Sequence, residues 1–80
     1  SGAASATGYS GAASATGEKS AAMASGRHGR AMGASGCAIF LVHRDANWNI
    51  THAKAAIAGK DVKAHTWYSL NEAGEFVEVA

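Results

Sequence analysis

The chain has 80 residues, a formal net charge of +1, a single cysteine, ten glycines and no proline. This length allows one small domain, or a repeat arm with a cap. The near-neutral charge gives no reason to expect nucleic acid as a partner, no apolar run reaches the ~20 residues that span a bilayer, and a lone cysteine excludes an intrachain disulfide.

Near-copies of a nine-residue unit open the chain. Residues 4–8, 13–17 and 22–26 read ASATG, ASATG and AMASG, and a degraded fourth copy follows at 31–36. A fixed short period indicates one structural unit stacked on itself. The larger core-forming side chains all come later. We therefore divide the chain into a repeat region, residues 1–36, and a C-terminal cap, residues 37–80.

Each repeat unit is predicted to form a short strand. Its two alanines are two residues apart, so in a strand they point to the same side. A helix is disfavoured because a glycine in each unit would cost about 1 kcal/mol relative to alanine. Disorder stays open as an alternative for such a small, polar tract. The predicted small face consists of Ala4, Ala6, Ala13, Ala15, Ala22 and Ala24.

The energetics of one unit argue for neighbours. Fixing the backbone of one residue costs about 1–2 kcal/mol, whereas burying a methyl group returns only about 0.8 kcal/mol. A unit with two inward alanines therefore needs units above and below it and a second layer against its small face. We expect other chains to supply some of these neighbouring strands, in a homo-oligomer that is most simply a parallel trimer. Its axis would be lined by the alanine columns and by part of the segment Ile39–Val42.

The repeats, written Ala-x-Ala-x-Gly with Ser or Gly before the next Ala, resemble the head repeats of trimeric autotransporter adhesins and repeats of phage tail fibres and spikes. The resemblance covers residues 1–36 and implies trimeric β-rolls or β-prisms with small residues inside. The adhesin unit is usually longer than nine residues. The junction 33–37 and the ending 66–79 are also similar to uncharacterised repeat proteins of gut bacteria and their phages, a likeness that brings no activity with it.

The cap is predicted to contain four strands. An apolar run covers Cys37–His43, a second strand returns over Ile50–Ile57, an alternating segment covers Val62–Leu70, and Glu75–Val79 closes the set. The expected fold is therefore all-β: a short-repeat β-solenoid or β-roll arm followed by a four-stranded antiparallel β-meander that caps it, assembled as a trimer.

Catalytic and metal-binding patterns are weak in this sequence. His43 and His52 come near each other across the first hairpin, but no His-x-His pair and no carboxylate at ligand spacing accompanies them. Cys37 opens an apolar strand, which favours a buried small side chain over a catalytic thiol. We expect no catalytic residue, no metal and no cofactor.

The sequence thus favours a non-enzymatic structural or assembly module, a fragment of a phage tail or cell-surface fibre, located on a virion or an extracellular surface. Its main expected partner is a second copy of itself, with no nucleic acid and no membrane insertion. The alternative is a carbohydrate- or surface-binding adhesion module that uses exposed aromatics in turns, with Trp48 and Tyr9 as candidate ligand-binding residues.

Overall fold

The computed structural model describes residues 3–6, 11–15, 20–25 and 28–79, the first of these ranges in its backbone. These residues form strands and turns and contain no helix, so the predicted all-β class is confirmed. None of them forms a helix long and apolar enough to cross a membrane. The strands are β1 Ala3–Ala6, β2 Ala12–Ala15, β3 Ala21–Ala24, β4 Arg30–Gly33, β5 Ala38–Arg44, β6 Ile50–Ile57, β7 Tyr68–Leu70 and β8 Phe76–Glu78.

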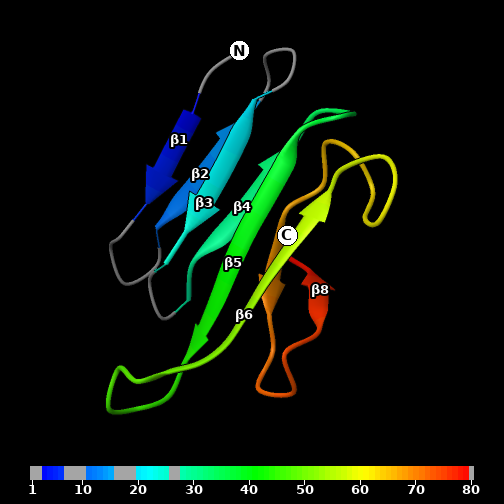
Figure 1. Cartoon of the computed structure of the whole chain (residues 1–80). Coiled ribbons are helices and arrows are strands. Elements are labelled where there is room, and N and C mark those ends of the chain that lie inside the picture. Colours follow the sequence, from blue (N-terminus) through cyan, green and yellow to red (C-terminus); the bar gives the residue numbers. More distant parts are fainter. Residues whose placement is uncertain (1–2, 7–10, 16–19, 26–27, 80) are drawn as a thin grey trace.

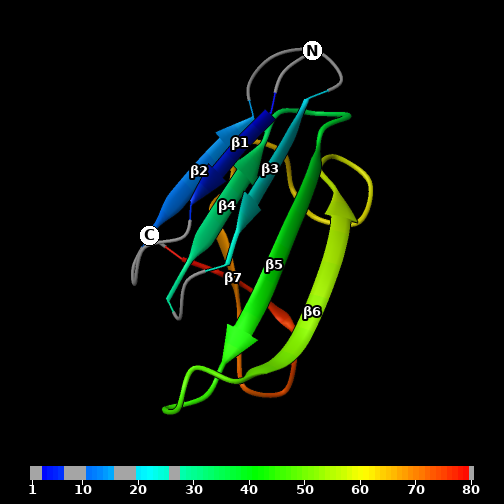
Figure 2. The same ribbon diagram turned by 60° about the vertical axis from the view of Figure 1, so that its left-hand side comes forward.

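Two four-stranded sheets face each other (Figures 1 and 2). Sheet A has the order β1-β3-β5-β6 and sheet B the order β2-β4-β7-β8. Successive repeat strands alternate between the sheets, and strands of the same sheet pair in parallel at an offset of eighteen residues, with Ala3 opposite Ala21 and Ala12 opposite Arg30. Each sheet therefore contains every second repeat strand.

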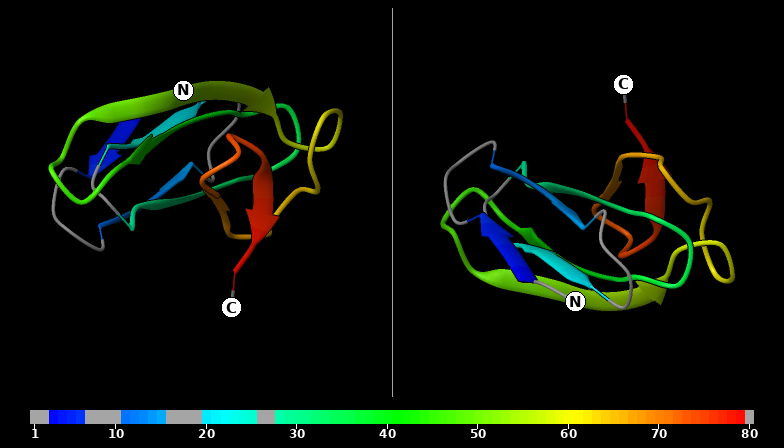
Figure 3. Two further views of the ribbon diagram at one scale, coloured as in Figure 1. Left: turned by 90° about the horizontal axis from the view of Figure 1, so that it is seen from below. Right: turned by 90° about the horizontal axis from the view of Figure 1, so that it is seen from above.

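The alanines of the repeats fill the space between the sheets. Along β2 exposed and buried residues alternate, and Ala13 and Ala15 are buried, as are Ala22 and Ala24 on β3. Figure 3, which looks along the layers, shows how closely the two sheets lie in this part. The opposite sheet of the same chain covers these four alanines. They therefore do not line an axis between chains, which corrects the expectation from the sequence.

The C-terminal region continues both sheets. Strand β5 pairs in parallel with β3, so that Ala22 lies beside Ile39 and Ala24 beside Leu41. The change from alanine to larger side chains thus occurs within one continuous sheet. The core formed here contains the buried residues Cys37, Ile39, Leu41, Ala56, Tyr68 and Leu70, with Phe76 packed against them.

The predicted hairpin of the second half is present, since β5 pairs antiparallel with β6 from Ala38–Ile57 to Arg44–Ile50. The single four-stranded meander is wrong. Strand β7 belongs to sheet B, where it pairs antiparallel with β4 and with β8. The alternating pattern from Val62 to Leu70 does not form one long strand because His65 has a left-handed backbone, with φ of 56°, and its amide donates to the Gly33 carbonyl at 2.7 Å.

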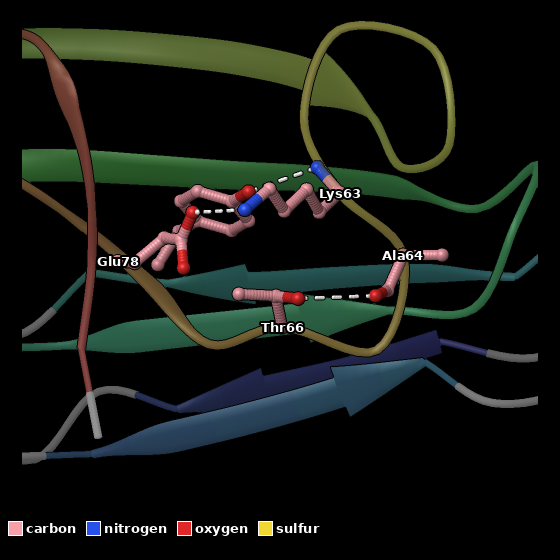
Figure 4. A network of polar contacts seen from close by, with 5 residues as sticks. Lys63, Ala64, Thr66 and Glu78 are labelled. Atoms are coloured by element: carbon pink, nitrogen blue, oxygen red, sulfur yellow. Dashed lines mark hydrogen bonds and ion pairs between the residues drawn. The ribbon is translucent and has the colours of Figure 1, made fainter.

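The segment between β6 and β7 crosses from one layer to the other and is held by polar contacts. The Lys63 amide donates to the Tyr68 hydroxyl at 2.8 Å, and the Thr66 hydroxyl donates to the Ala64 carbonyl at 3.1 Å. The Lys63 ammonium reaches Glu78 of β8 at 3.1 Å (Figure 4). These contacts fix where β7 enters sheet B.

Candidate functional site

The outer face of sheet A is mainly apolar, and no strand of the described part of the chain covers it. Residues paired across the strands share a face, and three such rows point away from sheet B. Among the residues whose side chains the structure describes, the outer face of sheet A consists of Ala21, Met23, Ala38, Phe40, Val42, Ala53, Ala55 and Ile57.

Three large side chains of this face lie on three neighbouring strands. Met23 is 44% exposed, Phe40 42% and Ile57 41%. A shallow groove of about 350 Å³ runs beside Met23 and Phe40 towards Val42 and Ala53. A contiguous apolar surface of this kind, on a small monomer, is typical of a contact with another macromolecule. The apolar run Cys37–His43 is evident in the sequence, but only the sheet order brings Met23 and Ile57 next to it.

A second surface is a polar cleft where β5 and β6 extend beyond the repeat strands. It has a volume of about 770 Å³. Its lining comes from the turn before β4, the adjoining ends of β5 and β6 with the turn between them, strand β7 and the turn after it. The lining residues are His28, His43, Arg44, Asp45, Ala46, Thr51, His52, Ser69, Leu70, Asn71 and Glu72. The sequence predicted the proximity of His43 and His52; His28 and Glu72 join them only through the sheet topology.

His43 and His52 are directly opposite each other, with ring centroids 6.2 Å apart. Thr51 Oγ1 lies 2.9 Å from His43 Nδ1 and 3.2 Å from His52 Nδ1, and its hydroxyl donates to the His43 carbonyl. The Thr51 hydroxyl thus joins the two imidazole rings through one oxygen atom. Two imidazoles fall short of the three or four protein ligands that hold zinc, and the described residues contain no group of three suitable side chains.

The turn between β5 and β6 carries Trp48, the candidate ligand-binding aromatic. Trp48 is 44% exposed and has a left-handed backbone with φ of 65°. The Arg44 guanidinium lies 5.6 Å from the centre of its ring and donates to its carbonyl at 2.9 Å. Asp45 organises this turn, because one carboxylate oxygen accepts the amides of Asn47 and Asn49 at 2.8 and 3.0 Å. Tyr9, the other candidate, lies outside the described residues.

The predicted small face is the interior of the repeat. Ala13, Ala15, Ala22 and Ala24 are each at most 3% exposed. Ala4 and Ala6 belong to β1, where their side chains lie outside the described part of the chain. These four buried alanines are thus packing residues and do not form a binding surface.

Comparisons of the chain with protein-family models, with curated proteins and with solved structures found no match.

Proposed function

We propose that this chain is a non-enzymatic structural module, a β-solenoid arm ended by a hairpin cap, which assembles with copies of itself through the outer face of sheet A. A trimer is the assembly that we favour, as part of a fibre on a virion or an extracellular surface. The observation that carries the proposal is that the exposed Met23, Phe40 and Ile57 lie on the same face of three adjacent strands, in two neighbouring cross-strand rows.

The repeat register supports the structural part of the proposal. Each coil of eighteen residues places identical or similar strands in parallel above one another, with alanines inside. Contacts between adjacent repeats of this kind build elongated scaffolds. The sheet edges farthest from β1 and β2 do not continue the parallel repeat. Each sheet ends there in an antiparallel hairpin, β5–β6 or β7–β8. Hairpins that do not continue the repeat are suited to end it.

The free energy gained by burying exposed apolar side chains supports the proposed self-assembly. Fully burying a large apolar side chain is worth about 1.5–3 kcal/mol. Phe40, Met23 and Ile57 retain around two fifths of their surface, so covering them with a second copy recovers a good part of that free energy. The alanines between these residues leave room on the same face for the large side chains of a partner, as in aligned packing of two sheets.

Sedimentation equilibrium on three proteins tests this function. The parent chain is expected to have a mass well above 8.1 kDa, most simply three times that value. Phe40→Ser removes the central side chain of the outer face and is expected to shift the protein to monomer. Val77→Ser is the matched control, because Val77 is also an exposed apolar strand residue, 37% exposed, but lies on β8 of sheet B. A parent chain that is monomeric, or a loss of assembly in both variants, would exclude the outer face as the contact.

A carbohydrate-binding module is the second candidate. Its support is the backbone of Trp48, because a bulky residue with positive φ is costly and such strain occurs preferentially at functional sites. The polar cleft begins in the same turn, at Asp45 and Ala46. Binding of the parent chain to a panel of immobilised glycans, lost in Trp48→Ala, would favour this function; equal binding by both proteins, or none by either, would count against it.

A further inference from the structure

In the described part of the chain, one edge of each sheet lies at the same end of the molecule. Strand β1 ends sheet A and β2 ends sheet B, and the figures place the two strands together at the blue end of the chain. Among the described strands, β1 pairs only with β3 and β2 only with β4. Each of these edge strands therefore pairs with a described strand along one side only.

The hydrogen bonds of β2 show which of its backbone groups face outwards. The Arg30 amide donates to the Gly11 carbonyl at 3.0 Å, and the Ala34 amide donates to the Ala15 carbonyl at 2.8 Å. In a parallel ladder alternate residues point the same way. Gly11, Ala13 and Ala15 thus face β4, whereas the amides of Ala12 and Ser14 face the open edge.

We propose that these paired edges bind a further coil of the same nine-residue unit, an eighteen-residue segment that extends both sheets in parallel. The proposal rests on the structural function above and names the partner of a different surface. Its basis is continuity with an interface that already exists: β1 lies on β3, and β2 on β4, in the same parallel register. A further coil would repeat that contact, with alanines inside and two strands of four residues.

The hairpin end of a second molecule is a poorer fit to these edges. It presents β6, with eight residues, and β8, with three, whereas β1 and β2 have four each. A second copy that met the same edges around a two-fold axis would pair antiparallel, unlike the contacts β1–β3 and β2–β4 between repeat strands, which are parallel. The edges at the repeat end therefore select the repeat unit itself.

Extension of the chain tests the proposal. One protein carries a duplicate of residues 1–18 before Ser1, which preserves the nine-residue period, and its control carries the same eighteen residues in shuffled order. Amide hydrogen exchange is measured at Ala12 and Ser14. We expect the duplicated segment to slow exchange at both amides by about tenfold or more, relative to the shuffled control, because each acquires a carbonyl partner. Exchange at Ala13, which already faces β4, serves as the internal reference.

Two results would overturn the proposal. Equal exchange at Ala12 and Ser14 in the extended protein and its shuffled control would show that the edge does not accept the unit. Protection of both amides in the parent chain that increases with protein concentration would show that a second copy occupies the edge. Neither result depends on the outer face of sheet A, so Phe40→Ser, which affects assembly there, separates a failure of this inference from a failure of the proposed function.

Discussion

Gly33 lies against Ile39 so closely that a methyl group at Gly33 would sit 3.2 Å from Ile39 Cγ2 and equally close to Ala58 Cβ. The corresponding position in the earlier units is alanine, as in Ala15 and Ala24. The inner column thus loses its last methyl group at the level where the first large side chain enters the core. The imperfect fourth repeat is therefore the junction between the alanine interior and the larger core.

Gly33→Ala is expected to destabilise the fold by about 1–2 kcal/mol, because the added methyl group overpacks this junction. Chemical denaturation measures the change in the free energy of unfolding. A double-mutant cycle with Ile39→Ala checks the cause, since the added methyl should cost much less once the isoleucine is shortened. Equal costs in both backgrounds would mean that Ile39 does not limit the space.

Ala13→Leu is expected to destabilise the repeat region by about 1–3 kcal/mol, because the space between the sheets has no room for a larger side chain. Ala12→Leu is the control on the same strand, since Ala12 is exposed and Ala13 buried. Thermal unfolding compares the two variants. If both had the same midpoint as the parent chain, the buried alanine column would not determine the sheet separation.

Asp45→Ala is expected to destabilise the β5–β6 turn by about 1–2 kcal/mol, because the amides of Asn47 and Asn49 and the Asn49 side chain lose their acceptor. Asp45→Asn retains one carbonyl oxygen that can accept the two amides and should recover most of this loss. Unfolding free energies of the three proteins give the comparison. A turn equally stable with alanine and asparagine would contradict the role assigned to the carboxylate.

The hydrogen bond and the charge of Glu78 raise the pKa of Lys63 above its ordinary value of 10.5. A raised pKa in the folded state means that the pair stabilises the protein fully below pH 10.5 and that this contribution is lost as the pH rises through the folded-state value. Both side chains are largely exposed, so the effect is small. We expect Glu78→Gln to lower the unfolding midpoint slightly at neutral pH and to have no effect once Lys63 is deprotonated. A difference that persists at the same size at alkaline pH would exclude the ion pair as its source.

The repeat could be predicted from sequence because its information is local. A period of nine with two alanines two residues apart indicates strands, and β2 and β3 occur where the alanines predict them. The β5–β6 hairpin could be predicted from the apolar run Cys37–His43, the polar residues after it and the returning segment Ile50–Ile57. The arrangement of the repeat strands in two sheets could not be predicted in the same way. Nothing in one unit indicates that the next unit lies in the opposite sheet of the same chain.

The position of β7 could not be predicted because it depends on one backbone conformation. His65 adopts a left-handed φ that its residue type does not require, and this turns the chain towards β4. The polar cleft depends on that turn, since Leu70 and Glu72 reach His43 only through β7 and the turn that follows it. The outer face of sheet A likewise needs the strand order, because Met23 and Ile57 are 34 positions apart in the sequence.

The dependence of the thermal unfolding midpoint on protein concentration tests the central claim, that copies of this chain cover one another's outer face of sheet A. Folding coupled to association makes the midpoint rise with concentration. We predict such a rise for the parent chain over a hundredfold range of about 1–100 µM and a constant, lower midpoint for Phe40→Ser. A parent midpoint that does not change over this range would contradict the account.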